Sequence, residues 1–299
     1  MPDRQALIVV NRRGRRGRSD LSRGIHRLEE AGIDVFVTYC RDPERVPEVI
    51  QRFAPAADLI VIGGGDGTVS SALPAVLASG RPLGLLPMGN ANDFARTLGI
   101  PFGIEQACAV IADGYLRSID LGCVNSRPFL NVASIGVSVE VARRLTPQAK
   151  RRWGVLAYLA VAWEALHRQQ SFTARIECGG QSHERRCIQV AVGNGRFYGG
   201  GMTIVDDAAI DDGRLDLYAL PRVPWWRLLV LLPVLRWGRH RPVPDILSLH
   251  GPELTIATVP TMLPINVDGE VAAETPARFR VLRAALQVFA PRRSPSASR

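Results

Sequence analysis

Short apolar runs alternate with amphipathic segments along the first 121 residues of the chain. The apolar runs predict four buried strands, at Ala6–Asn11, Asp34–Cys40, Asp58–Gly64 and Pro82–Gly89. The segments between them predict helices, at Ser19–Ala31, Pro43–Phe53 and from about Thr68 to Ala78. Because apolar strands separated by helices are typical of a parallel sheet covered on both faces, residues 1–121 are predicted to form an open α/β domain.

The pattern changes after residue 121, where strand-like segments follow one another with turn residues between them. The clearest of these segments are Phe172–Cys178, Cys187–Asn194, Arg214–Leu220, Leu254–Thr258 and Ile265–Glu270. Two helices are predicted among them, at Ala149–Gln169 and Trp225–Trp237. Residues 122–290 are therefore predicted to form a mostly antiparallel β-sandwich domain, and the polar residues 291–299 a disordered tail.

The composition adds a strong positive charge to this picture. The chain has 299 residues and a formal net charge of +9, from 37 basic and 28 acidic residues. Such a charge favours an anionic partner, which could be nucleic acid, a phosphorylated ligand or an acidic membrane surface. Lys150 is the single lysine, however, and an excess of arginine is equally typical of coding bias. The charge alone therefore does not choose among these partners.

The cysteines and the apolar runs bear on the cellular compartment. The five cysteines have no spacing typical of a metal site, and the chain begins almost directly with a predicted strand. Both features favour reduced thiols in the cytoplasm. The longest apolar runs, Val155–Trp163 and Leu228–Leu235, are shorter than the roughly 20 residues of a membrane span. The sequence predicts a cytoplasmic protein that associates with membranes only peripherally.

A glycine-rich loop, GGGDGT, follows the third predicted strand. Its residues are Gly63, Gly64, Gly65, Asp66, Gly67 and Thr68. Glycines let a ligand approach the backbone, and the N–H groups of such a loop and of the next helix can bind phosphate oxygens. A tight strand–helix turn would explain the glycines alone. A carboxylate beside a phosphate site needs Mg²⁺ between the two charges, so Asp66 favours a site for a metal–nucleotide complex.

A second strand–turn–helix unit, LLPMGNANDFARTLGIP, spans Leu85–Pro101. Its turn carries Asn92 and Asp93, and either residue could cap the helix that follows. The carboxyl ends of parallel strands meet at one edge of a sheet, so the two turns place Asp66 and Asp93 at the same edge. Two carboxylates at one edge are harder to explain as helix caps alone.

The segments GGGDGTVS and LPMGNANDFAR together resemble the catalytic domain of the diacylglycerol kinase family, which includes sphingosine, ceramide and bacterial lipid kinases. The first segment is shared with NAD kinases, whereas the second indicates the lipid branch. Further segments match along nearly the whole chain: ALIVVN at the start, SIDLG at Ser118–Gly122, DDGRLD at Asp211–Asp216 and NVDGE at Asn266–Glu270. The resemblance implies an ATP-binding domain followed by a β-rich lipid-substrate domain.

The resemblance implies that ATP and Mg²⁺ bind on the Gly63–Thr68 loop, with Asn11, Gly89, Asn90 and Asn92 nearby. The arginine-rich loop that follows Asn11 suits the phosphates of a nucleotide. The chain departs from the usual family pattern at three places. Pro is usual where Arg12 stands, Thr where Asn90 stands, and Asn-Glu where Ser70-Ser71 stand. The glutamate that is missing there leaves part of the family's polar network unmatched.

The resemblance also implies roles for acidic residues. Asp66, Asp93 and Asp120 would form an acidic network around the catalytic Mg²⁺. In the second domain Asp268 would accept the proton of the attacking hydroxyl, with Glu270 either assisting or merely solvated on its strand. All five therefore count as candidate catalytic residues.

A structural Mg²⁺ is a further implication of the resemblance. It would be held by the carboxylate of Asp212 and the main chain of Ala209 and Arg214. An Asp-Gly pair such as Asp212-Gly213 is equally typical of an ordinary hairpin turn. Both interpretations stay open from the sequence.

Two stretches combine tryptophan, leucine and basic residues, a composition that favours membrane interfaces. Val223–Pro242 is the candidate for docking at an anionic membrane surface. Lys150–Trp163 is the second candidate, and it could instead line an acyl-chain pocket. A core helix with a basic end would have the same composition as the first stretch.

The resemblance implies an ATP-dependent lipid kinase, with diacylglycerol as the default acceptor and other lipid alcohols left open. A NAD kinase is the alternative among enzymes, and the N-D-F-A-R segment argues against it. A noncatalytic nucleotide-binding regulator is the alternative outside enzymes, but the carboxylates that it would not need are all present. The arginines are spread along the chain and no nucleic-acid-binding motif is found, so nucleic acid is not expected as a partner. A homodimer is left open.

Overall fold

The structure, a computed structural model, describes residues 4–11, 18–137, 139, 171–205, 207–222 and 246–292. The chain divides into two compact units. Unit 1 comprises Met1–Leu121, Gly199–Gly201 and Arg283–Arg299, and unit 2 comprises Gly122–Tyr198 and Met202–Leu282. The predicted helices at 149–169 and 225–237, the arginines of loop 12–17 and both candidate membrane stretches lie outside the described residues.

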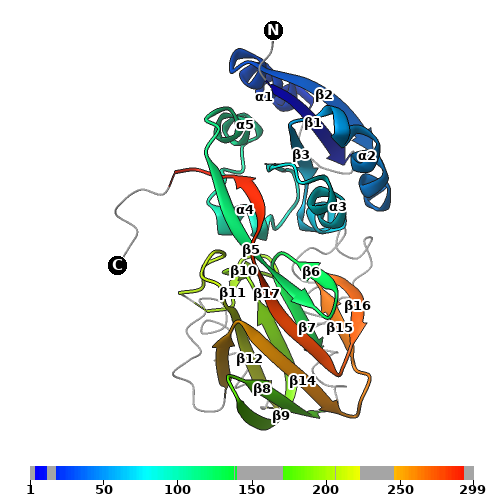
Figure 1. Ribbon diagram of the computed structural model, residues 1–299, viewed down its shortest axis with the longest axis vertical. Helices are drawn as coiled ribbons and strands as arrows, with labels where there is room; N and C mark the ends of the chain where they lie inside the picture. The colour runs from blue at the N-terminus through cyan, green and yellow to red at the C-terminus, as the bar shows by residue number, and fades with distance from the viewer. Residues whose placement is uncertain are drawn as a thin grey trace. The chain divides into compact units, whose positions relative to one another are not determined.

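Unit 1 is a parallel sheet with helices on both faces (Figure 1). Its elements are β1 (Arg4–Asn11), α1 (Arg18–Glu30), β2 (Ile33–Cys40), η1 (Pro43–Arg45), α2 (Val46–Phe53), η2 (Ala54–Ala56), β3 (Leu59–Gly64), α3 (Asp66–Ser79), β4 (Leu83–Pro87), α4 (Asp93–Leu98) and α5 (Ile104–Ala112). The strand order is β2–β1–β3–β4, and the end of β17 (Ala277–Phe289) pairs parallel with β4. Helix α1 packs with α5, and α2 packs with α3.

The residues of these strands explain the order of the sheet. Strands β1 and β3 are apolar along most of their length and almost wholly buried, as strands covered on both faces must be. Strand β2 lies at the edge, and it leaves Phe36 and Tyr39 exposed. Helix α3 begins at Asp66, two residues before the predicted start, and it continues through Pro74. The predicted α/β fold of this part is confirmed.

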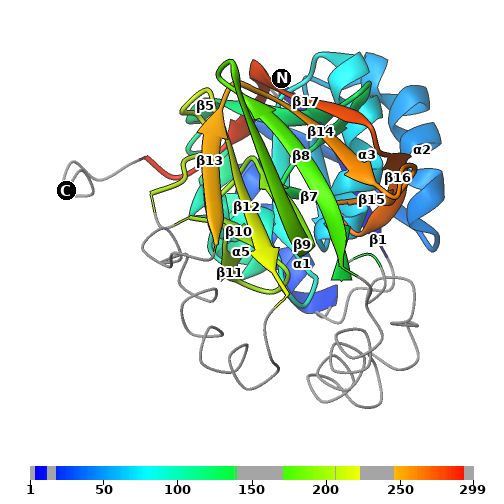
Figure 2. The same ribbon diagram turned by 90° about the horizontal axis from the view of Figure 1, so that it is seen from below.

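Unit 2 is mostly antiparallel. Its elements are β5 (Leu116–Val124), which begins in unit 1, β6 (Arg127–Phe129), β7 (Val132–Gly136), β8 (Phe172–Cys178), β9 (Gln181–Gly193), β10 (Phe197–Tyr198), β11 (Met202–Thr203), β12 (Leu215–Pro221), β13 (Leu247–Gly251), β14 (Glu253–Val259), β15 (Pro264–Val267), β16 (Glu270–Glu274) and the first part of β17. The strand order is β16–β15–β7–β9–β8–β14–β17, and β12 and β13 branch from β9. Figure 2 shows β13, β12, β9, β8 and β14 from below.

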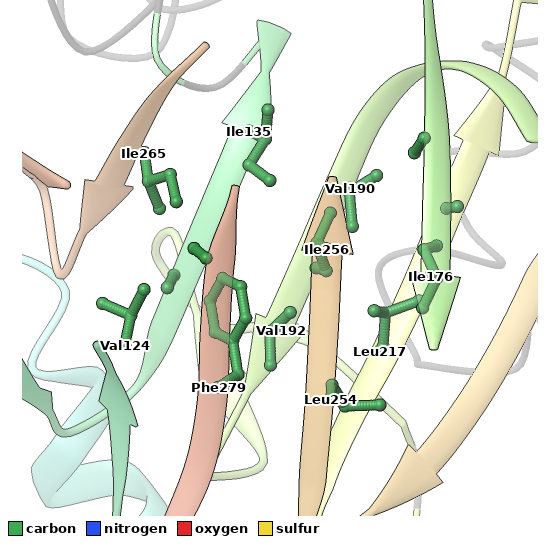
Figure 3. Packing of buried hydrophobic residues seen from close by; sticks show 14 of the residues in the cluster. Val124, Ile135, Ile176, Val190, Val192, Leu217, Leu254, Ile256, Ile265 and Phe279 are labelled. Atoms are coloured by element: carbon green, nitrogen blue, oxygen red, sulfur yellow. The ribbon is translucent and has the colours of Figure 1, made fainter. Parts of the chain in front are cut away.

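Strand β9 connects the two parts of this sandwich. Its first half, Gln181–Cys187, pairs with β8, whereas its second half pairs with β7 on one side and β12 on the other. Apolar side chains of these strands form a core in which Phe279, Ile256 and Val192 lie together (Figure 3), and others from β9 and β12, such as Ile188 and Tyr218, belong to a second cluster. The predicted β-sandwich is confirmed. Within the described ranges, no helix combines the length and hydrophobicity needed to cross a bilayer.

Candidate active site

The carboxyl ends of β1, β3 and β4 lie side by side, because these strands are neighbours in the sheet of unit 1. Asn11 ends β1, and its Nδ2 donates a hydrogen bond of 3.0 Å to Oγ1 of Thr68 in the first turn of α3. Both side chains are buried. Two residues of the predicted nucleotide site are thus brought together, and their hydrogen bond ties the start of α3 to the end of a central strand.

The loops after β3 and β4 touch through their backbones. The N–H of Met88 donates to the carbonyl of Gly64 at 2.9 Å. A side chain on Gly89 would collide with the Cα of Gly65, and one on Gly64 would lie 2.6 Å from the Cβ of Thr68. Glycine is therefore required at Gly89 because the two loops approach closely, and at Gly64 because Thr68 of the same loop packs against it. The close approach makes one continuous surface of the two predicted phosphate-binding loops.

Asn92 stabilises the loop after β4 through hydrogen bonds to its backbone. Its backbone is left-handed, with φ of 51°, and its side chain is 4% exposed. Its Oδ1 accepts the N–H of Gly89 at 2.9 Å, and its Nδ2 donates to the carbonyl of Gly89 at 3.0 Å. The structure thus gives Asn92 a role inside the turn, and its predicted contact with the nucleotide stays a prediction. The exposed residue of this turn is Asn90.

Asp66, in the loop after β3, caps helix α4, which follows the loop after β4. Its Oδ1 accepts the N–H of Phe94, in the first turn of α4, at 3.0 Å. Neither Asn92 nor Asp93 caps α4 with its own side chain, as the sequence had suggested either might. The cap therefore comes from a residue 28 positions away in sequence, and it locks the two loops to each other.

Asp93 is the most buried carboxylate of the two loops, with 3% of the residue exposed. Its Oδ2 accepts the N–H of Gly200 at 2.7 Å. Its Oδ1 is buried and has no hydrogen-bond partner among the described residues. Burial raises the pKa of Asp93, the N–H of Gly200 lowers it in part, and the negative charge of Asp66 raises it again, with a net shift upwards. Asp93 thus has an oxygen and a negative charge that the protein leaves incompletely balanced.

The Asp66–Asp93 pair fits a cation that arrives with a phosphorylated ligand. Mg²⁺ is usually bound by one or two carboxylates together with substrate phosphates and water. Within the described ranges, no group of three or more acidic, His or Cys side chains is placed to hold a metal without other ligands. The cavity beneath the loops holds about 10 Å³, which is room for one water. A nucleotide would therefore lie on the outer surface of the loops, where Gly67 and Asn90 are exposed.

Asp120 has a separate contact in unit 1. It is 7% exposed, and its Oδ1 accepts the N–H of Ala284 at 2.8 Å. Ala284 has a φ of 47°, a conformation that is costly for a residue other than glycine. The carboxylate therefore holds a strained turn of β17 next to β5. The predicted membership of Asp120 in the Mg²⁺ network stays a prediction.

Asp268 lies in unit 2, in the turn between β15 and β16, with a φ of 48°. Its Oδ2 accepts the N–H of Leu130 at 2.7 Å, and its Oδ1 accepts those of Asn131 and Val132 at 2.9 and 3.1 Å. Three backbone donors fix the orientation of the carboxylate and stabilise its negative charge. The neighbouring Glu270 is exposed and pairs with Arg127 at 3.3 Å, as expected of a solvated strand residue.

The carboxylate of Asp212 is engaged by groups of the protein itself. The oxygens of Asp212 face N–H donors, from Ala209 at 3.2 Å and from Arg214 at 3.1 Å. The guanidinium of Arg214 lies 3.2 Å from Asp212, 3.4 Å from Asp207 and 3.5 Å from Asp216. Burial lowers the pKa of Arg214, but Asp216, Asp212 and Asp207 raise it above its usual value. A protein cation thus stands among these carboxylates, which disfavours a metal there, and the implied Mg²⁺ ligands stay a prediction.

The sequence analysis missed the glycine segment Gly199–Gly201, which contributes the donor to Asp93. It belongs to unit 1, although the strands on either side of it belong to unit 2. Its signal was visible as GGG in the sequence, the same run that begins the first loop. A run of glycines does not show which distant residue it contacts, so the signal could mark the segment but not its role.

Two family models match the chain. The diacylglycerol kinase catalytic domain matches residues 5–124. The YegS C-terminal NAD kinase beta sandwich-like domain matches residues 131–290. A diacylglycerol kinase of Staphylococcus aureus (strain bovine RF122 / ET3-1) is 31% identical over 236 residues, covering 78% of this chain and 75% of that protein. One of Staphylococcus saprophyticus is 28% identical over 271 residues, covering 89% and 88%.

Solved structures share the fold. A crystal structure from Bacillus anthracis str. Sterne has a TM-score of 0.82 at 24% identity, covering 97% of this chain and 96% of that chain. A second structure from that organism, described as a diacylglycerol kinase, has a TM-score of 0.77 at 22% identity, covering 96% and 97%. These similarities show a shared fold over nearly the full length of the chain.

Proposed function

The chain belongs to the diacylglycerol kinase family, and from that premise we propose that it is an ATP- and Mg²⁺-dependent lipid kinase. The enzyme transfers the γ-phosphate to the hydroxyl of a lipid alcohol. Diacylglycerol is the first candidate, with phosphatidic acid as its product. The observation that carries this proposal is the pair of interlocked glycine loops, which bring Asp66 and Asp93 together at the carboxyl edge of the sheet.

The glycine loops hold the phosphates of ATP. Exposed backbone at Gly67 and the exposed side chain of Asn90 provide polar groups on the outer surface of the loops, next to the N-terminus of α3. Asp66 and Asp93 are the residues that would hold Mg²⁺, either directly or through water. Mg²⁺, when bound, neutralises negative charge on the phosphate oxygens. The Asn11–Thr68 hydrogen bond keeps the first loop in place.

Asp268 is the general base of this proposal. The lipid hydroxyl oxygen bonds to the γ-phosphorus, the bond from that phosphorus to the bridging oxygen breaks, and ADP leaves. The hydroxyl proton passes to the Asp268 carboxylate. The three N–H donors from Leu130, Asn131 and Val132 support this role by holding the carboxylate in one orientation.

Peripheral association with an anionic membrane surface is part of the same proposal, because the acceptor is a membrane lipid. The net charge of +9 supports it. Val259, the last residue of β14, and Met262, in the loop that follows it, are 70% and 67% exposed and add apolar contact area. Sedimentation with vesicles of anionic and of neutral phospholipid tests this part. If the protein sediments with neither kind of vesicle, the proposed membrane association is contradicted.

The direct test of the function is transfer of labelled γ-phosphate from ATP with Mg²⁺ to a total lipid extract in mixed micelles. A parallel reaction contains NAD in place of lipid. A labelled lipid is the expected result, and its identity names the acceptor. Labelled NADP would instead place the chain among NAD kinases. ATP binding without transfer to either acceptor would favour a nucleotide-binding regulator.

A further inference from the structure

The N–H of Gly200 makes the shortest hydrogen bond of Asp93, at 2.7 Å to Oδ2. The N–H of Gly201 interacts with the same carboxylate and, like Gly200, lowers its pKa against the effect of burial. Hydrogen bonds from N–H groups to an ionised carboxylate are stronger and more directional than those between neutral groups. These two glycines therefore restrict how the Asp93 side chain can rotate.

Backbone conformation explains why this segment is glycine. Gly199, Gly200 and Gly201 have φ of 58°, 92° and 90°. An L-residue rarely adopts these values, whereas glycine adopts them freely. The space around Gly200 is open, with no atom within 4 Å of the position of a Cβ. The requirement at Gly200 thus comes from the direction of its N–H, and not from crowding.

The hydrogen bond to Oδ2 fixes the orientation of the Asp93 carboxylate and thereby the position of its second oxygen, Oδ1. Oδ1 is buried and has no hydrogen-bond partner among the residues the structure describes. The neighbouring carboxylate, Asp66, is held through Phe94. Both members of the acidic pair are therefore oriented by backbone N–H groups, and phosphoryl transfer depends mainly on such positioning.

We propose that Gly200 is a positioning residue of the nucleotide site, and that Gly199–Gly201 is a third glycine segment of that site. The segment acts through Asp93, whose Oδ1 it directs towards the Mg²⁺ that accompanies ATP. This inference rests on the proposed function, since it assumes that Mg²⁺ and ATP bind at the Asp66–Asp93 pair. It extends the site to residues more than 100 positions away from either loop in sequence.

Gly200→Ala tests the inference, and Gly180→Ala is its matched control. Gly180 has a φ of 77° and no atom within 4 Å of a Cβ, but it lies in the turn between β8 and β9. Both variants place alanine in a costly conformation, so their Tm values should agree within about 2 °C. The measurement is the Kd of a non-hydrolysable ATP analogue, with Mg²⁺ and with EDTA.

We expect Gly200→Ala to weaken binding with Mg²⁺ by about 10-fold, and to leave binding in EDTA unchanged. Gly180→Ala should match the wild type in both conditions. In a chain that also carries Asp93→Ala, Gly200→Ala should have less than about a 2-fold further effect, because the side chain that accepts the N–H of Gly200 is gone. This double-mutant result separates positioning from a general loss of structure.

Equal Kd values for the two alanine variants would overturn the inference. So would a Gly200→Ala effect that persists in the Asp93→Ala background, or one that is equally large in EDTA. If the wild type binds the analogue but phosphorylates no lipid, the proposed function is contradicted. The Kd values of the two alanine variants would then still decide the role of Gly200. A wild type that does not bind the analogue at all would contradict both.

Discussion

The two acidic clusters of the molecule differ in what balances their charge. In unit 1, Asp66 and Asp93 lie close enough for Asp66 to raise the pKa of Asp93, and their oxygens are oriented by backbone N–H groups. In unit 2, Asp207, Asp212 and Asp216 surround the guanidinium of Arg214. The negative charge of the Asp66–Asp93 cluster can therefore attract a cationic ligand, whereas the charge of the Asp207–Asp212–Asp216 cluster is balanced by Arg214.

The comparison teaches that an acidic cluster alone does not indicate a metal site. Asp93 and Asp216 are equally buried, at 3% and 4% exposed. Burying a carboxylate is costly unless its charge is paired. Arg214 forms an ion pair with Asp216. For Asp93 we expect the balancing charge to come from a bound cation. We therefore expect a divalent cation to be needed for catalysis at the first cluster and not for folding at the second.

Removal of Mg²⁺ should have the largest effect. Excess EDTA is expected to reduce phosphate transfer by about 1,000-fold or more, because the charge on the phosphates is then no longer neutralised. The Tm of the protein without nucleotide should change by less than about 2 °C, because Arg214 supplies the internal cation. Transfer assays and thermal unfolding with and without EDTA check this. A large fall of Tm in EDTA would place a structural metal in the molecule.

Asp268→Asn should reduce kcat by about 100-fold or more, the range of a lost general base. An amide cannot accept all three N–H donors, so some loss of stability is expected as well. The rate is therefore measured well below the Tm of the variant, and compared with its ATP binding. Retained ATP binding with lost transfer supports the base. Wild-type kcat in the folded variant would show that Asp268 only holds residues 130–132.

Asp93→Asn should reduce kcat by about 100-fold, because the variant loses a charge that holds Mg²⁺. Its Tm should equal or exceed that of the wild type, since the upward pKa shift shows that the ionised form of Asp93 destabilises the fold. Asn can still accept the N–H of Gly200. Kinetics and thermal unfolding at pH 7 without Mg²⁺ check both parts. A clear drop in Tm would assign Asp93 to structure.

Arg214→Met should have the smallest effect on activity and a measurable one on stability. Removing the cation leaves three carboxylates facing one another, at a cost of about 2 kcal/mol for a partly buried group. The Tm should fall by about 6 °C, and added Mg²⁺ should restore part of it. Arg175→Met is the control, because Arg175 pairs with Glu184 at 4.0 Å on an exposed surface. Equal Tm values for the two variants would contradict the role of Arg214.

The sequence predicted the parts of the molecule that follow local rules. Uninterrupted apolar strands and intervening helices predicted the α/β fold, and alternating segments predicted the sandwich. The two strand–turn–helix units predicted that Asp66 and Asp93 lie at one edge of the sheet, because parallel strands end together. The fold and the centre of the site were accessible for this reason.

The remaining contacts depend on distant residues, which local patterns do not show. The cap of α4 is Asp66, from the preceding loop, and not Asn92 or Asp93 from its own turn. Gly200 reaches Asp93 across more than 100 residues of sequence. Arg214 was considered only for its main chain, whereas its side chain is the cation of the cluster.

The most direct test of the central comparison is the binding of Mn²⁺, followed through its EPR signal as a substitute for Mg²⁺. The wild type should bind Mn²⁺ tightly only when a non-hydrolysable ATP analogue is present. Asp93→Asn should abolish that binding, and Asp212→Asn should leave it unchanged. Tight binding of Mn²⁺ without nucleotide, lost in Asp212→Asn and kept in Asp93→Asn, would contradict the account.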